Sequence, residues 1–422
     1  MRGLVHLYKL SGGYFATTII NQALPFLILP VLTRYLSPAE YGSFALFYFY
    51  LTVSNSLSGL SITNFISKNF FTSDKKQIAG IIGNSILIVG IFSLITLIII
   101  LILYSFFRVY INLPLLWLVL IPFTSFAIIV FAMGLNVLLN SKKVLLFSKH
   151  QVGNTAINLG ISLLLVVVFL RDWEGRAMGI IFSYFISALI SLYYLKKNDF
   201  VSFTISKNQI NNILKVVIPL IPNSVQSVMI SQAGIFFIQY YYTRELLGLY
   251  SIGFQLATLI YLLVSTLSMS WSPYLYEQMA DGNKINKQYL TRLFYALFGV
   301  LLIGALFINL ISLPVLKIMT TPEYYAANEF VPWLTLGFFF QGLYLLFYPV
   351  LIYNNKQKFI SLVSFVNMLI MIVLNIWFIK IFGYMGVAYA FCLTNLFMFI
   401  PLILKAQKVM PLPWLKALKI WN

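Results

Sequence analysis

The sequence predicts an all-α integral membrane protein with about twelve transmembrane helices in two repeat-related halves. Two observations carry this prediction, the composition and a helix–turn–helix motif that occurs twice. Hydrophobic residues make up 61% of the 422 residues and charged residues only 9%, and the mean hydropathy is +0.91. A soluble domain carries about a quarter charged residues. So much apolar surface requires lipid around the chain.

The repeated motif joins the end of one apolar run to the start of the next. Thr33-Arg34 matches Thr243-Arg244 half a chain length later, and Gly42 matches Gly248. A chain that repeats a motif at half its length consists of two similar halves. In membrane transporters such halves face each other across a substrate path.

Two further pairs of segments match in the same order along the two halves. Asn140-Ser141-Lys142-Lys143 matches Asn354-Asn355-Lys356-Gln357-Lys358, and Gly175-Arg176-Ala177 matches Gly386-Val387-Ala388. Each pair alone is weak evidence, but pairs in register support a duplicated bundle.

The apolar runs set the predicted spans, since a helix needs about 20 residues to cross the hydrocarbon layer. Each span must be helical, because lipid leaves no partner for an exposed backbone group. We predict spans at 11–33, 41–65, 79–105, 113–138, 151–170, 177–195, 216–240, 248–271, 292–312, 331–352, 361–379 and 385–404.

The positions of the basic residues predict the topology. Three quarters of the 28 Lys and Arg residues fall on cytoplasmic segments if both termini lie in the cytoplasm. The net charge of +18 therefore reflects loop orientation, and we expect no nucleic-acid partner. The predicted divisions are an N-terminal six-helix lobe at 1–200, a C-terminal six-helix lobe at 201–405, and a basic amphipathic tail at 406–422. We expect the tail to lie on the anionic inner leaflet.

The sequence offers no catalytic or metal-binding constellation. Its one cysteine excludes an internal disulfide, and the two histidines, His6 and His150, are far apart. No Gly-rich phosphate loop precedes a Lys-Ser or Lys-Thr pair. We therefore expect neither enzymatic activity nor a metal or cofactor.

Four motifs resemble those of the polysaccharide transporters, the O-antigen and capsule repeat-unit flippases of the multidrug/oligosaccharidyl-lipid/polysaccharide (MOP) exporter superfamily. They are the segments Leu32–Gly42, Leu247–Ser251, Lys317–Ala327 and Gly383–Ala388. The resemblance implies a MATE-like fold with two six-helix bundles around a central cavity. It also implies alternating-access flipping of an undecaprenyl-diphosphate-linked oligosaccharide across a bacterial inner membrane. This lipid-linked oligosaccharide and membrane lipid are the implied partners, with a polymerase and other polysaccharide-assembly proteins as further candidates.

The same superfamily contains two alternatives, the MATE-like multidrug exporters and the lipid II-type flippases. Exporters commonly carry a carboxylate in the first helix, and the lipid II flippase carries charges there. Here Asn21 and Gln22 occupy the middle of that span, and the first acidic residue is Glu40 in a turn. A polysaccharide polymerase or acyltransferase fits less well, since its large outer loop would carry paired Arg or a catalytic His. The longest outer segment, 313–330, has one Lys and two Glu.

Uncharged amides concentrate in the first, second, seventh and eighth spans. Amides suit sugars, because each provides hydrogen-bond donors and acceptors without a fixed charge. The alternative is that they hold helices together. The predicted sugar-binding residues are Asn21, Gln22, Asn55, Asn64, Asn223, Gln226, Gln232 and Gln255.

A diphosphate requires cations, and basic residues lie at several span ends. The candidates are Lys9, Lys68, Lys215 and Arg292 on the inner side and Arg34 and Arg244 on the outer side. The alternative roles are anchors to lipid phosphate or ion pairs of Arg34 with Glu40 and of Arg244 with Glu245.

Prolines interrupt the first and seventh spans, which correspond in the repeat. Prolines at matching places in two halves can mark bending points for alternating access, or static kinks. The hinge candidates are Pro25, Pro30, Pro219 and Pro222.

Overall fold

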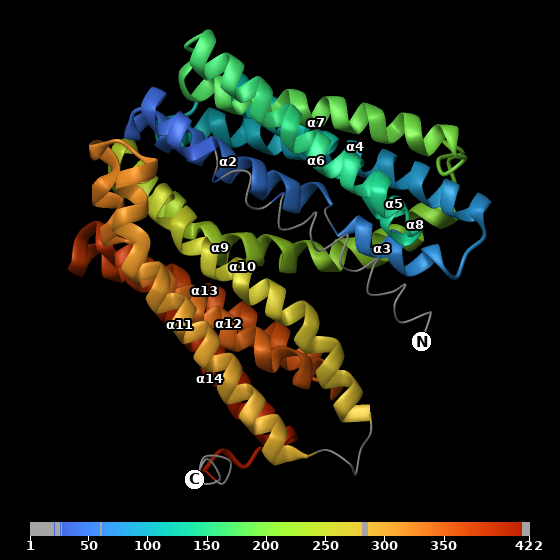
Figure 1. Ribbon diagram of the computed structural model, residues 1–422. Helices are drawn as coiled ribbons and strands as arrows, with labels where there is room; N and C mark the ends of the chain where they lie inside the picture. The colour runs from blue at the N-terminus through green and yellow to red at the C-terminus, as the bar shows by residue number, and fades with distance from the viewer. Residues whose placement is uncertain (1–20, 22–25, 27, 60, 281–285, 416–422) are drawn as a thin grey trace. The chain divides into compact units, whose positions relative to one another are not determined.

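The computed structural model describes residues 21, 26, 28–59, 61–280 and 286–415 (Figure 1). These residues are almost all helical, and none of them forms a strand. The chain packs as two compact units, Met1–Gln232 and Ala233–Asn422. The lobe boundaries inferred from the repeat, at residues 200 and 405, remain predictions.

The N-terminal unit consists of helices that pack on one another in a bundle. Residues 28–35 are helical and precede the first labelled helix. The helices are α2 (Pro38–Ser58), α3 (Ile62–Phe70), α4 (Lys75–Ile111), α5 (Leu115–Asn140), α6 (Val144–Leu163), the π-helix η1 (Leu164–Val168), α7 (Asp172–Lys197), α8 (Lys207–Val217), the 3₁₀ turn η2 (Ile218–Leu220) and the first part of α9 (Ile221–Tyr241).

The C-terminal unit repeats the pattern of long helices. It contains the rest of α9, followed by α10 (Arg244–Ala280), α11 (Lys287–Met319), the 3₁₀ segment η4 (Pro322–Glu329), α12 (Val331–Tyr353), α13 (Gln357–Phe382), the 3₁₀ turn η5 (Gly383–Met385) and α14 (Gly386–Val409).

Nine helical stretches of the described residues are long and apolar enough to cross a membrane. One of them, Gln357–Val409, covers the two predicted spans 361–379 and 385–404. The predicted first span, 11–33, lies mostly outside the described residues. The chain is therefore a multi-pass membrane protein.

The prediction of one continuous span at 41–65 is wrong. The helix ends at Ser58, and Gly59 adopts a left-handed conformation with φ of +108°. Glycine enters this region without a steric penalty because it has no Cβ. A new helix, α3, then starts at Ile62, so the polar residues of this segment lie on two helices.

Corresponding helices of the two units make corresponding contacts. In the N-terminal unit α5 contacts α2, α4 and α7, and in the C-terminal unit α12 contacts α10, α11 and α14. Likewise α6 packs on α7 as α13 packs on α14. This shared pattern confirms that the chain is a duplicated helical bundle.

The turns after α5 and α12 have the same geometry. Lys142 and Asn355 are both left-handed, with φ of 56° and 55°. The next residue donates back to a helix carbonyl in each case, Lys143 N to Leu138 O and Lys356 N to Leu351 O, both at 2.9 Å. The structure therefore confirms that the two segments correspond, and it pairs Lys142 with Asn355.

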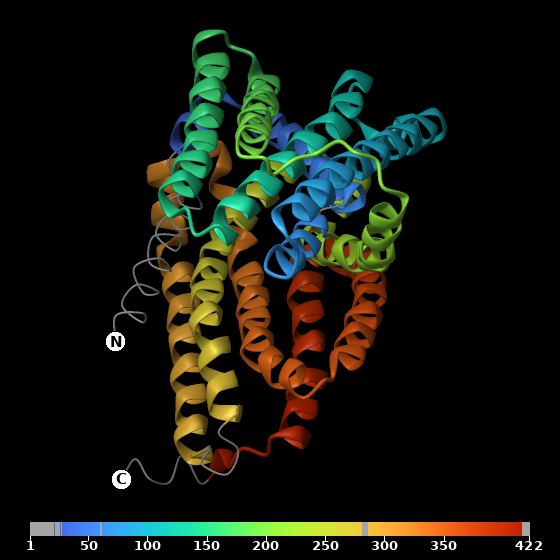
Figure 2. The ribbon, with the colours of Figure 1, turned by 90° about the vertical axis from the view of Figure 1, so that its right-hand side faces the viewer.

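The segment between α7 and α8 is attached to the N-terminal unit along its length (Figure 2). Ser202 N donates to Ala79 O of α4 at 3.0 Å. The α8 helix then buries one apolar face, in which Ile213 and Val217 are fully buried against α3 and α4. The polar connection between the halves is therefore part of the N-terminal bundle.

The start of the predicted tail packs against the C-terminal unit. The α14 helix continues to Val409, and Leu412 is 4% exposed. The ring of Trp414 lies 5.4 Å from that of Tyr295, and the Tyr295 hydroxyl donates to Trp414 O. Residues 406–415 are thus held by this unit, and the expected contact with the inner leaflet remains a prediction for the rest of the tail.

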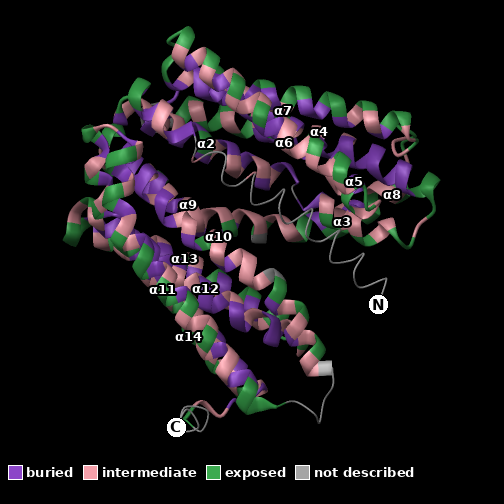
Figure 3. Ribbon diagram, viewed as in Figure 1, coloured by how far each residue is buried: buried purple, intermediate pink, exposed green. Residues whose placement is uncertain are grey.

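Exposed residues alternate with buried ones along the long helices of each unit (Figure 3), and many of the exposed residues are large and apolar. On α4 they include Ile91, Ile98 and Ile102, and on α11 they include Ile303 and Leu310. Exposed apolar rows on membrane-spanning helices are the surfaces that lipid covers.

Candidate functional site

Two of the four predicted polar segments meet inside the N-terminal unit. Thr52 of α2 donates to Gln232 Oε1 of α9 at 3.3 Å, and the hydroxyls of Ser61 and Ser224 lie 3.0 Å apart. Asn55 Oδ1 is buried and has no hydrogen-bond partner. This face therefore offers neutral donors and acceptors, at least one of them unused.

The other predicted amides are distributed more widely. Asn21 accepts a hydrogen bond from Thr155 of α6, so it belongs to the interior of the N-terminal unit. Gln226 is buried, whereas Asn64 is exposed. Gln255 lies on α10 in the other unit. Gln22 and the side chain of Asn223 lie outside the described residues.

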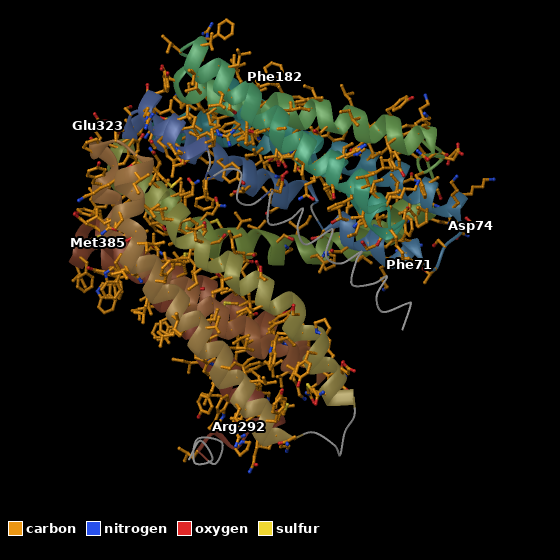
Figure 4. All side chains as sticks on the ribbon, viewed as in Figure 1. Phe71, Asp74, Phe182, Arg292, Glu323 and Met385 are labelled. Atoms are coloured by element: carbon orange, nitrogen blue, oxygen red, sulfur yellow. The ribbon has the colours of Figure 1, made fainter. Side chains whose placement is uncertain are left out.

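The inner cation candidates lie near helix ends. Lys68 and Lys215 are exposed in the last turns of α3 and α8, two helices that contact each other. Arg292 is partly buried near the start of α11, at the opposite end of that unit from Glu323 and Met385 (Figure 4). Its Nε is buried without a hydrogen-bond partner. Lys9 lies outside the described residues.

Arg34 and Arg244 do not occupy equivalent positions, so the prediction that both end repeat-related helices is wrong for Arg244. Arg34 lies in the last turn before α2, whereas Arg244 is the first residue of α10. The reason lies in the caps. Ser37 caps α2 and Thr243 caps α10, and each cap is the second residue after the preceding helix ends, so the two turns are equally long and Arg34 corresponds to Tyr240.

Glu40 completes the cap of α2 and forms no ion pair with Arg34. Its carboxylate accepts from Ser37 N at 2.6 Å and from Ser37 Oγ at 2.8 Å. This is a capping box, in which the serine and the glutamate satisfy backbone groups at the helix start. The alternative of an Arg34–Glu40 pair is therefore wrong, and Arg34 is exposed.

Three of the four hinge candidates lie among the described residues, and their role as bending points remains a prediction. Pro219 lies in the 3₁₀ turn η2 and Pro222 in the first turn of α9, directly after the firmly packed α8. Pro30 lies within the helical residues 28–35. Pro25 lies outside the described residues.

Sequence reasoning missed a buried arginine in the N-terminal unit. Arg176, in the second turn of α7, is only 8% exposed. Its Nη1 donates to Asn158 and to Ser162 of α6, and its guanidinium lies over the ring of Phe44. The available signal was the repeat itself, which places Arg176 opposite Val387.

A cavity of about 190 Å³ lies between α5, α6 and α7. Its polar lining consists of Lys149, His150, Asn154 and Ser187. Ser187 donates to Asn154 at 2.9 Å, and His150 Nε2 is buried without a partner. None of the predicted sugar or phosphate residues lines this cavity.

Duplicated bundles of membrane-spanning helices with neutral polar faces define a membrane transporter with a MATE-like fold. The chain belongs to the polysaccharide biosynthesis protein family, whose sequence model matches residues 11–279. The MatE family model matches residues 219–377. Together these matches place the chain among the transporters and flippases of the MOP superfamily.

Known proteins support the same assignment. The chain is 25% identical over 399 residues to Lsg locus putative protein 1 of Haemophilus influenzae, covering 90% of this chain and 94% of that protein. Its fold is similar to that of the lipid II flippase MurJ in an inward closed conformation, with a TM-score of 0.71 and 17% identity over 96% of this chain and 89% of that one. An inward-facing MATE family multidrug resistance transporter matches with a TM-score of 0.70 and 14% identity over 92% of this chain and 95% of that one.

Proposed function

We propose that this protein flips undecaprenyl-diphosphate-linked oligosaccharide repeat units from the cytoplasmic to the outer leaflet of a bacterial inner membrane. The polymer is an O-antigen or a capsule, both termini lie in the cytoplasm, and a polymerase acts on the product. The observation that carries the proposal is the neutral polar face of α2 and α9, with the unpartnered Asn55 Oδ1. The family match supports a polysaccharide-related cargo.

Such a face suits a sugar better than a small cation. Hydroxyl-rich ligands need many donors and acceptors of moderate strength, which amides and serines supply. The path works by alternating access. The polyprenyl tail stays in lipid throughout, so only the sugar and the diphosphate need a polar route.

The sugar-binding role of this polar face is tested by the double substitution Asn55→Leu with Gln232→Leu, on α2 and α9. We expect surface polysaccharide to fall at least about tenfold, because leucine offers a sugar no hydrogen bond. The measurement is quantitative immunoblotting of surface polymer at matched protein levels. The exposed Gln77→Leu at the start of α4 serves as the control and should leave polymer unchanged. Wild-type polymer in the double variant would refute this role.

The role of the outer arginines is tested by Arg34→Ala combined with Arg244→Ala. If these groups receive the diphosphate, polymer export should fall at least about tenfold, since each charged hydrogen bond contributes about 1.5–3 kcal/mol. The double variant Lys317→Ala with Lys380→Ala removes the same charge from exposed positions and is the control. Full polymer in the arginine variant at normal expression would remove both residues from the site.

The driving force is tested by collapsing the membrane potential. Moving an anion outward gains about 2.3 kcal/mol per charge per 100 mV when the inside is negative. In vesicles without ion gradients, we expect flipping to slow when an ionophore dissipates the potential. Undiminished flipping would exclude an electrophoretic mechanism.

A multidrug exporter is the second candidate, and the MatE match over residues 219–377 favours it. An exporter predicts drug resistance on overexpression and unchanged surface polymer on deletion. The flippase proposal predicts the reverse pair of results. Measuring both phenotypes in one strain decides between them.

A further inference from the structure

Arg176 is a charge inside a membrane bundle without a carboxylate partner. The nearby Glu174 instead accepts a hydrogen bond from Trp117 Nε1 at 3.1 Å. The ion pair found among the described residues joins Lys75 to Asp199, at the surface. A buried charge without a countercharge is strongly unfavourable, and an ionisable group within a membrane span usually serves function.

The contacts of the guanidinium leave one edge unused. Nη1 makes both hydrogen bonds, to Asn158 Oδ1 and to Ser162 Oγ, and the Phe44 ring centroid lies 5.2 Å from Cζ. Nε is buried and has no partner. The edge formed by Nε and Nη2 is one of those with which arginine grips a carboxylate or phosphate through two parallel hydrogen bonds.

The second half of the chain shows that the fold does not require this charge. Gly175 and Gly386 match in the repeat, and each brings its helix against the backbone of the preceding one. A Cβ would lie 3.1 Å from Leu165 C at the first position and 2.3 Å from Phe378 O at the second. The next residue is Arg176 in one unit and Val387, 1% exposed, in the other. An apolar side chain therefore fills the same place in an equivalent crossing.

We infer that Arg176 binds an oxyanion, a phosphate or a carboxylate, through its Nε–Nη2 edge inside the N-terminal unit. Asn158 and Ser162 are positioning residues, since they hold Nη1 and thereby orient the free edge. The inference deepens the proposed function, on which it rests for the source of the anion. The carrier diphosphate, an acidic sugar and an anionic lipid headgroup share this chemistry, and the experiment separates them.

Binding to the purified full-length protein in phosphatidylcholine nanodiscs tests the inference directly. Three arms use farnesyl diphosphate, glucuronate, and nanodiscs containing phosphatidylglycerol, with affinity from calorimetry or thermal stabilisation as the readout. We expect at least one oxyanion to stabilise the wild type and Arg176→Gln to bind it at least about tenfold more weakly. Arg171→Gln, which removes an exposed arginine beside the same helix start, should bind as the wild type does.

Two further variants keep the result decisive. Arg176→Lys retains the positive charge but loses the planar guanidinium group, so it should weaken oxyanion binding several-fold. This variant replaces Arg176→Gln in the test if Arg176→Gln cannot be purified. Ser162→Ala removes one of the two hydrogen bonds of Arg176 Nη1, and it should weaken oxyanion binding less than Arg176→Gln or Arg176→Lys does. Equal affinity in wild type and Arg176 variants, or no binding of any probe to the wild type, would overturn the inference.

The outcome is separable from that of the proposed function. Binding in nanodiscs requires no transport and no sugar chain. A flippase whose oxyanion affinity is independent of Arg176 would keep the proposed function and lose this site. If oxyanion binding depends on Arg176 but deletion of the protein leaves surface polymer intact, the anion site stands and the proposed function fails.

Discussion

We expect replacement of Gly179 by leucine to reduce accumulation of the folded protein at least about tenfold. A Cβ at this position would lie 2.0 Å from Ser162 Oγ, 2.9 Å from Ser162 N and 3.0 Å from Asn158 O. Two of these atoms belong to the backbone of α6, which cannot move without breaking its own hydrogen bonds. Forcing extra atoms into a packed core costs about 1–3 kcal/mol or more, and proteins are marginally stable.

Fluorescence-detected size-exclusion chromatography of a tagged protein provides the measurement. We expect the monodisperse peak of Gly179→Leu to fall at least about tenfold, the effect of about 1.4 kcal/mol or more at the stability threshold. Gly160→Leu on the neighbouring α6 is the matched control, because nothing lies within 4 Å of a Cβ there. Equal peaks for the two variants would show that α6 and α7 do not cross as closely as the structure shows.

Asn84→Leu should release the connection between the two halves. Asn84 is 0% exposed, and its Nδ2 donates to Thr204 O at 3.2 Å and to Gln209 Oε1 at 2.8 Å. Its Oδ1 accepts from Ser206 N at 3.3 Å. Leucine leaves these groups unpaired, at a cost of about 1–3 kcal/mol for each one that stays buried.

Two readouts follow this change. We expect a lower thermal unfolding temperature in detergent and faster protease cleavage within residues 198–206, because the segment no longer binds α4. The control is Gln77→Leu on the same helix, an exposed amide that makes no contact with the segment in the hydrogen bonds described. Unchanged cleavage of Asn84→Leu would show that other contacts, such as Ser202 N to Ala79 O, hold the segment.

The long helices were predictable from the sequence because the membrane imposes a strict rule. An apolar run of about 20 residues must be helical in lipid, whatever its neighbours are. The predictions for α4, α5 and α12 therefore lie close to the observed bounds. The helix break at Gly59 could not be predicted, because a glycine in an apolar run is also tolerated inside a helix. Only the left-handed φ of Gly59 in the structure shows that the helix ends there.

The repeat was also visible in the sequence, although its register was not. Matching Arg34 with Arg244 ignored the capping residues, which decide where a helix starts. Ser37 and Thr243 are the equivalent positions, and this pairing also aligns Gly42 with Gly248. The sequence letters alone favoured the longer match of Thr-Arg pairs.

The sequence indicated which types of residue line the polar spans, but not which side chains meet in the folded protein. Polar residues of the second and seventh spans lie together, in hydrogen bonds that join Thr52 to Gln232 and Ser61 to Ser224. Such bonds fit either role predicted for these spans, sugar binding or helix contact, and sugar binding remains a proposal.

The sequence predicts Arg176 to be an outer-side cation, because it lies between the predicted spans 151–170 and 177–195. Its burial depends on Phe44 of α2, which is distant in sequence, and on Asn158 and Ser162 of the preceding α6, and no local sequence pattern indicates these contacts.

The most direct test of the account is flipping by the purified protein in proteoliposomes. The cargo is an undecaprenyl-diphosphate-linked oligosaccharide placed in one leaflet, and a glycosidase added outside reports its arrival in the other. The proposed function predicts protein-dependent cleavage of the whole cargo pool, reduced by Asn55→Leu with Gln232→Leu and retained in Gln77→Leu. The contradicting result is cleavage of only the cargo that was already in the outer leaflet at the start, although the protein is properly folded in the membrane.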